Sequence, residues 1–167
     1  MGKLISHITC IAAIVFLLCS FAKSPKLEEK LQTVPFEQLD SLQAIKQKKV
    51  VVFIHTDWCK YCLQMSNTTF KNDSIISLLN DHFYFVDLDA ETKNDIKYKG
   101  YAFKYKPSGA NTGVHELAEQ LGEIEGKLNY PTISIINHKN EIIFQNGGLM
   151  KTNEMLTVLS KLYVIIN

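Results

Sequence analysis

The stretch His55–Cys62, HTDWCKYC, follows directly on the apolar run Val50–Ile54, VVVFI. This run shows no polar alternation, which predicts a strand covered on both faces, as in a sheet flanked by helices. After the second cysteine, Met65 and Phe70 suit a helix that begins at or near Cys59. The chain therefore places a Cys-x-x-Cys pair at the junction between a buried strand and a helix.

This junction gives the two cysteines different chemistry. In the first turn of a helix, the sulfur of Cys59 faces unpaired backbone N–H groups and the positive end of the helix dipole, which favour the thiolate. Cys62 lies close enough to form a disulfide with Cys59, so it can resolve a mixed disulfide between Cys59 and a substrate. Lys60 adds a nearby positive charge, and Asp57 opposes it.

The first residues are typical of an export signal. Lys3 precedes the apolar run 10–18, and Ser20-Phe21-Ala22 offers small residues where a signal peptidase cleaves, so we expect 1–22 to be a signal peptide. An uncleaved membrane anchor and lipidation of Cys19 stay open as alternatives. The protein would then be periplasmic or otherwise exported, or anchored facing outside the cytoplasm. We expect a linker over 23–34 and one domain over 35–167.

Removal of the leader leaves Cys59 and Cys62 as the two thiols of the domain. A bridge between them closes a small loop and constrains the unfolded chain little, which argues against a structural staple. Structural zinc needs about four ligands, and His55 alone lies near the pair in sequence, so we expect no metal. A metal carrier that uses the two cysteines and His55 remains an alternative, and copper or zinc binding would support it.

The charge balance gives no electrostatic footprint for nucleic acid. Lys3 is the one charged residue among 1–22, so the remainder carries 17 basic and 17 acidic side chains, and the basic ones are all Lys. We therefore expect no nucleic-acid partner.

The rest of the chain alternates helices and strands. Asp73 is placed to cap a short helix, the run 83–88 (FYFVDL) predicts a second buried strand, and Val114–Leu121 shows a helical stripe that stops at Gly122. The apolar runs 131–136 and 141–145 flank a polar turn, which predicts a β-hairpin before a last helix near Thr152. The pattern predicts an α/β fold with a central mixed sheet flanked by helices.

These residues resemble the thioredoxin superfamily. The matching motifs are Trp58-Cys59-Lys60-Tyr61-Cys62, the strand in front of it, Tyr130-Pro131-Thr132 and Gly147-Gly148. WCKYCLQM followed by Phe70 and FVDLD is most similar to small exported thioredoxin-like proteins and disulfide-interchange domains. The resemblance spans about 35–163, except for a segment around 92–112, and implies a thioredoxin-like fold.

The resemblance also implies roles. Cys59 would attack, Cys62 would resolve, and the redox-active disulfide would need no bound cofactor. Tyr130-Pro131 would be joined by a cis peptide bond and present an extended substrate chain, with Trp58, Lys60 and Tyr61 beside it. For Trp58, a lid over the disulfide and simple core packing are the two interpretations.

Two departures from thioredoxin limit what the resemblance implies. Phe53 stands where thioredoxin buries an aspartate that accepts the proton of the resolving thiol, and a thiol in apolar surroundings resists ionisation. Lys60-Tyr61 replaces Gly-Pro, so the reducing power cannot be transferred. Potentials in this fold range from about −270 to −120 mV. The resemblance to interchange domains favours a reductase or interchange enzyme over an oxidase.

We expect protein substrates with disulfides or thiols, a membrane or periplasmic dithiol electron donor, and a monomer. The aromatic and Lys residues around Gly100 predict an inserted hairpin-like segment over 92–112, either simply packed on one face or serving to dock a partner. The alternative to an enzyme is a thioredoxin-fold binding or assembly module without redox turnover.

Overall fold

The computed structural model describes residues 29–164, and the signal peptide expected over 1–22 lies outside them. The first half contains α2 (Phe36–Ile45), β1 (Lys49–His55), α3 (Lys60–Asn67), the 3-10 turn η2 (Thr69–Lys71), α4 (Asp73–His82) and β2 (Phe83–Asp89). The second half contains β3 (Ile96–Tyr98), β4 (Tyr101–Phe103), β5 (Tyr105–Pro107), β6 (Gly113–His115), α5 (Glu116–Gly122), β7 (Glu123–Ile124), β8 (Lys127–Leu128), β9 (Thr132–Ile136), β10 (Ile142–Gly147) and α6 (Thr152–Val164).

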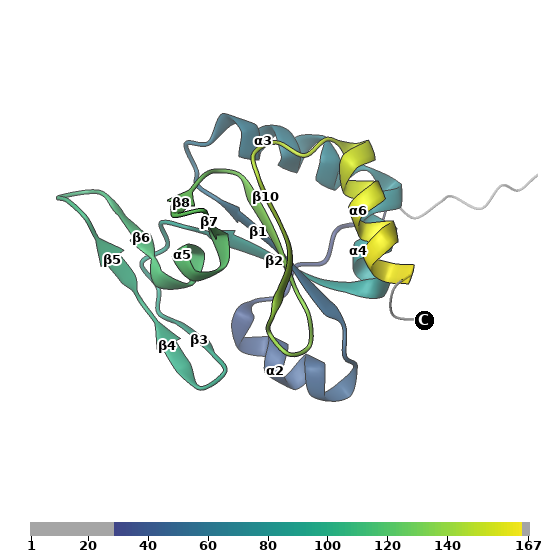
Figure 1. Ribbon diagram of the computed structural model, residues 1–167, viewed down its shortest axis with the longest axis horizontal. Coiled ribbons are helices and arrows are strands. Elements are labelled where there is room, and N and C mark those ends of the chain that lie inside the picture. The colour runs from purple at the N-terminus through teal and green to yellow at the C-terminus, as the bar shows by residue number, and fades with distance from the viewer. Residues whose placement is uncertain (1–28, 165–167) are drawn as a thin grey trace, which may run out of the picture.

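The centre of the fold is a four-stranded sheet in the order β10-β9-β1-β2 (Figure 1). β1 runs parallel to β2 and antiparallel to β9, and β10 returns antiparallel to β9. The expected mixed sheet is therefore confirmed. The strand that leads into the cysteines is an inner strand, which explains why VVVFI shows no polar alternation.

Helices cover both faces of this sheet (Figure 1). On one face, α3, α4 and α6 pack on alternate residues of β1, and this cluster includes Val51, Phe53 and both cysteines. On the other face, α2 and α5 pack on the intervening residues, including Val50, Val52 and Ile54. Since successive side chains of a strand point to opposite faces, alternate residues of the apolar run pack in the two clusters.

Residues 29–34, part of the segment expected to be a linker, lie against the edge of the domain. Thr33 forms a parallel bridge with Phe85 of β2, and the N–H of Val34 donates to the Phe85 carbonyl at 2.8 Å. The side chain of Asn80 accepts a hydrogen bond from the N–H of Gln32 at 2.9 Å. These contacts continue the sheet beyond β2. Among residues 29–164, no helix has the length and apolar character needed to cross a membrane.

The inserted segment forms two small hairpins, which confirms its hairpin-like character and extends it to residue 115. β3 pairs with β4, and β5 pairs with β6. Lys99 and Gly100 join the first pair with φ of 52° and 79°, the left-handed conformation that a two-residue hairpin turn requires. Val114 belongs to β6, so the helix expected from Val114 begins only at Glu116.

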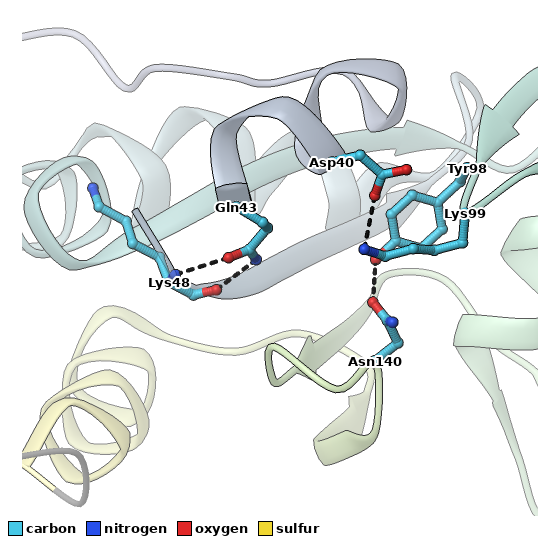
Figure 2. Close-up of polar contacts among 6 residues, drawn as sticks. All are labelled: Asp40, Gln43, Lys48, Tyr98, Lys99 and Asn140. Atoms are coloured by element: carbon cyan, nitrogen blue, oxygen red, sulfur yellow. Dashed lines mark hydrogen bonds and ion pairs between the residues drawn. The ribbon is translucent and has the colours of Figure 1, made fainter. Parts of the chain in front are cut away.

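Polar contacts fix the first hairpin to the body of the domain (Figure 2). Lys99 Nζ lies 2.8 Å from Asp40 Oδ1 of α2, and the Tyr98 hydroxyl donates to Asn140 Oδ1 at 2.6 Å. The ring of Tyr98 packs edge-on against Phe36. In Figure 1 this hairpin lies beside α2, away from α3. The hairpin is thus packed on one face, as one of the two interpretations predicts.

Asn72, rather than the expected Asp73, caps α4. Its side-chain oxygen accepts hydrogen bonds from Ser74 N and Ile75 N at 3.1 and 3.3 Å, and Asp73 is the first helical residue. Both residue types cap helices well, so the sequence alone left the register open by one position.

Candidate active site

Cys59 and Cys62 form a disulfide at the start of α3. Their Cα atoms are 5.2 Å apart. Cys59 is the N-cap of the helix, and its Sγ accepts a hydrogen bond from the Cys62 N–H at 3.1 Å. The Cys59 N–H in turn donates to the Thr56 carbonyl at 3.2 Å. The expected helix start at Cys59 is confirmed, and one sulfur serves both as the helix cap and as half of the disulfide.

The two sulfurs differ in their surroundings. Cys59 is 6% exposed and Cys62 is 2% exposed, and both belong to the buried cluster under α3. The Cys59 sulfur receives a backbone N–H, whose partial positive charge stabilises a thiolate at that position. The arrangement suits an outer nucleophile and an inner partner thiol.

Trp58 is 64% exposed, so it is not part of the core. Its ring packs edge-on against that of Tyr130, with centroids 5.7 Å apart, and its Nε1 donates a hydrogen bond to Glu91 Oε2 at 3.0 Å. These two contacts hold a large aromatic surface next to the disulfide. Glu91 was not predicted as a site residue; its position just after the FVDLD strand was the available signal.

The peptide bond between Tyr130 and Pro131 is cis, the isomer that the resemblance implies. Pro131 is buried, and its carbonyl accepts from the Gly148 N–H at 2.7 Å. Pairing of β9 with β1 begins only at Thr132, so the Tyr130 backbone lies outside the sheet. Burial, together with the carboxylates of Glu91, Asp89 and Glu119, raises the pKa of the Tyr130 hydroxyl to about 12, which keeps it neutral at physiological pH.

Lys60 and Tyr61 occupy the exposed first turn of α3 between the cysteines. Tyr61 is 61% exposed, and Leu63 in the next position is 63% exposed. Trp58, Tyr61 and Leu63 thus expose large apolar side chains in and next to the first turn of α3, where the disulfide lies. Leu63 was not among the residues expected to bind substrate, and its exposure on a short amphipathic helix was the missed signal.

On the cysteine side of β1, Phe53 is 2% exposed and stacks on His55, with ring centroids 5.1 Å apart. His55 Nε2 lies 2.6 Å from Asp87 Oδ1 of β2. Burial lowers the pKa of His55, but the Asp87 hydrogen bond and the carboxylates of Asp87, Asp89 and Asp57 outweigh burial and raise it overall. Asp87 was predicted to lie in a strand, but its pairing with His55 was not predicted.

Two further histidines, His82 and His115, have structural surroundings. His115 is buried and caps α5 by accepting the Leu117 N–H at its Nδ1, while His82 packs against the ring of Tyr163. Within residues 29–164, no group of three or more His, Cys, Asp or Glu side chains is placed to hold a metal ion.

Comparison with known proteins assigns this site to a family. The family model described as a thioredoxin-like domain matches residues 36–163. The chain therefore belongs to the thioredoxin-like family. No curated protein sequence matches it.

Solved structures share the fold at low sequence identity. A thioredoxin from Thermus thermophilus is 20% identical, with a TM-score of 0.57, and the match covers 80% of this chain and 87% of that one. A putative disulphide-isomerase from Bacteroides thetaiotaomicron is 23% identical, with a TM-score of 0.55 and coverage of 83% and 96%. A DsbH oxidoreductase is 14% identical, with a TM-score of 0.55 and coverage of 86% and 90%.

Proposed function

We propose that this protein is an exported thiol-disulfide oxidoreductase that reduces or exchanges disulfides in protein substrates. The observation that carries the proposal is the Cys59–Cys62 disulfide, with the Cys59 sulfur at the N-cap of α3 and a backbone N–H directed at it. A structural staple would gain little from so small a loop. The family membership agrees with this chemistry.

In the reducing direction, the Cys59 thiolate attacks a substrate disulfide and forms a mixed disulfide, releasing one substrate thiolate. Cys62 then attacks the Cys59 sulfur, which releases the second substrate thiolate and leaves the Cys59–Cys62 bridge. A membrane or periplasmic dithiol protein returns two electrons to the bridge. The protein acts as a monomer without a bound cofactor, since the sulfurs themselves carry the electrons.

Substrate binding is assigned to the residues around the disulfide. Tyr130 lies outside the β9 ladder, so its backbone is placed to pair with an extended substrate segment as an added strand. Trp58 and Tyr61 supply exposed aromatic surface on either side of Cys59, and Lys60 supplies a positive charge. Pro131 fixes the chain direction at this point.

A trapping experiment tests the proposal. The Cys62→Ser variant is expected to accumulate a covalent complex with substrate that dissolves in dithiothreitol, whereas Cys59→Ser is expected to form none. If the double Cys59→Ser/Cys62→Ser variant supports the biological role as well as the wild type does, the protein is a binding or assembly module instead. Stoichiometric copper or zinc binding would favour a metal carrier.

The direction of the reaction is tested by equilibration with glutathione redox buffers and gel-shift alkylation. We expect a potential toward the reducing end of the range from about −270 to −120 mV. A value near −120 mV would identify an oxidase and overturn this part of the proposal. Cell fractionation of the full chain tests the exported location.

A further inference from the structure

Cys62 must lose a proton before it can resolve a mixed disulfide, and within residues 29–164 the buried cluster that contains it includes no basic or acidic side chain. It is 2% exposed, and the core cluster around it is built from apolar and sulfur-containing side chains such as Met65, Phe70 and Ile133. A thiol in such surroundings resists ionisation. The Cys62 proton therefore has to leave towards a polar group at the border of this cluster.

His55 and Asp87 stand at that border. Side chains alternate along β1, so His55 points to the same face as Val51 and Phe53, which is the face covered by α3. The His55 ring stacks on Phe53, which shares the buried cluster with Cys62. Phe85 faces the same cluster from β2, and Asp87 follows it by two residues.

A cavity lies between Asp87 of this pair and α3. It has a volume of about 150 Å³ and is lined by Phe53, Asp87, Ser66, Phe70, Lys71 and Thr33, among others. Ser66 lies one helical turn beyond Cys62 in α3. The volume exceeds several-fold the roughly 10–15 Å³ that one water needs, and Asp87, Ser66 and Lys71 provide polar partners for water. Water in the cavity can carry a proton between α3 and Asp87.

We propose that His55, oriented by Asp87, is the base that accepts the Cys62 proton through water while Cys62 attacks the mixed disulfide. The assignment rests on the proposed oxidoreductase function and adds a residue role to it. Asp87 accepts the Nε2–H of His55, which leaves the lone pair on Nδ1 to take a proton.

The step balances as follows. Cys62 S–H transfers its proton to His55 Nδ1, the Cys62 sulfur bonds to the Cys59 sulfur, and the bond from Cys59 to the substrate sulfur breaks. The electron pair leaves with the substrate thiolate, and the imidazolium then returns the proton to this thiolate or to solvent. In the reverse direction, imidazolium protonates Cys62 as the bridge opens.

The charges around His55 support this role. Asp87 and Asp89 of β2 and Asp57 before α3 stabilise its protonated form, and Lys71 of η2 lines the same cavity. Because these carboxylates outweigh the effect of burial and raise the pKa of His55, its imidazole has the basicity to take up a proton from a thiol.

The test separates attack from resolution. The reduced protein, with Cys10 and Cys19 replaced by serine throughout, is mixed with an excess of an aromatic disulfide whose thiolate is coloured. The first phase of thiolate release reports attack by Cys59, and the second reports resolution by Cys62. Cys62→Ser should abolish the second phase alone. If the wild type shows no second phase, the proposed oxidoreductase function itself fails.

His55→Gln is expected to slow the second phase about 100-fold at neutral pH and to remove the inflection from its pH profile, while the first phase changes little. Asp87→Asn, at an exposed position, should slow the same phase, and Asp87→Glu should restore much of it. His138→Gln, in the exposed β9–β10 turn, is the matched control and should leave both phases unchanged.

Two results would overturn the assignment. One is a second phase in Asp87→Asn and His55→Gln with the wild-type rate and pH profile. The other is an equal slowing of both phases with the inflection retained, which would mean that His55 only supports packing. If His55→Gln does not fold, the two Asp87 variants decide the question by the same criteria.

Discussion

The indole N–H of Trp58 donates a hydrogen bond to the carboxylate of Glu91, with 3.0 Å between Nε1 and Oε2. This bond joins the loop before α3 to the segment after β2. Trp58 also packs edge-on against Tyr130, so an indole that is 64% exposed is held from two sides. An aromatic surface with a fixed orientation loses little conformational entropy when a partner binds to it.

Removal of the Glu91 carboxylate should release this indole. For Glu91→Ala we expect the KM for an unfolded disulfide substrate to rise about fivefold, corresponding to about 1 kcal/mol for an exposed charge-assisted bond. Trp58 is the single Trp of the chain, so its emission and anisotropy report the change directly. Glu91→Gln keeps an acceptor oxygen but loses the charge and should lie between the wild type and Glu91→Ala; unaltered emission in Glu91→Ala would contradict the prediction.

The His55–Asp87 pair predicts a pH-dependent stability. Because the folded-state pKa of His55 is raised above its unfolded value of about 6.5, its contribution is fully present below that pH and is lost as pH rises through the folded pKa. Urea unfolding from pH 5.5 to 8.5 should show the wild type losing more stability than His55→Gln. Parallel curves for the two proteins would contradict this sign, and NMR titration of His55 gives the pKa itself.

Leu159 anchors α6 in the cluster that also holds the cysteines, and it is 0% exposed. Leu159→Ala leaves a cavity and should reduce the free energy of unfolding by about 2–5 kcal/mol. Ile45, at the end of α2, is 84% exposed, so Ile45→Ala should change stability by no more than about 0.5 kcal/mol. Chemical denaturation of the two variants gives their free energies of unfolding, and a loss confined to Leu159→Ala shows that burial of the side chain is the cause.

The cap at Asn72 predicts a local effect. Asn72→Ala removes the acceptor for the N–H groups of Ser74 and Ile75 and should cost about 1 kcal/mol of stability. Asn72→Asp keeps an acceptor at the same place and should retain the wild-type midpoint in a denaturant titration. Equal losses in both variants would show that the cap is not the cause.

Tyr98 links the first hairpin to the β9–β10 turn (Figure 2). Burial, with a smaller contribution from Asp40, raises the pKa of Tyr98 to about 12, so its hydroxyl remains a donor to Asn140 at physiological pH. Tyr98→Phe should lower the free energy of unfolding by about 1 kcal/mol. Tyr101→Phe alters a side chain that is 72% exposed and should have no measurable effect.

The parts that the sequence predicted are those with a local pattern. The run Val50–Ile54 and the hairpin runs on either side of residues 137–140 indicate strands by composition alone, and the Cys-x-x-Cys spacing places both sulfurs in one helical turn. A helix that begins at or near Cys59 was predicted from the apolar residues Met65 and Phe70, and Cys59 is the N-cap of α3.

The parts that were missed depend on contacts between distant segments. Asp87 and Glu91 become partners of His55 and Trp58 only because β1 and β2 lie in parallel register, with His55 opposite Asp89. Segment 29–34 has a polar composition, and its backbone pairing with the edge of β2 is a contact that composition does not indicate. A single sequence records neither register nor edge pairing.

The Cys59 sulfur that caps α3 also belongs to the disulfide. Ordering of the first turn of α3 and reduction of the disulfide therefore involve the same atom. In a thermodynamic cycle, a change that stabilises the ordered first turn of α3 more in one oxidation state than in the other shifts the midpoint potential by that difference in free energy. Substitutions at the exposed positions Lys60 and Tyr61 that change helix propensity should therefore change the midpoint potential of the disulfide, although neither cysteine is replaced.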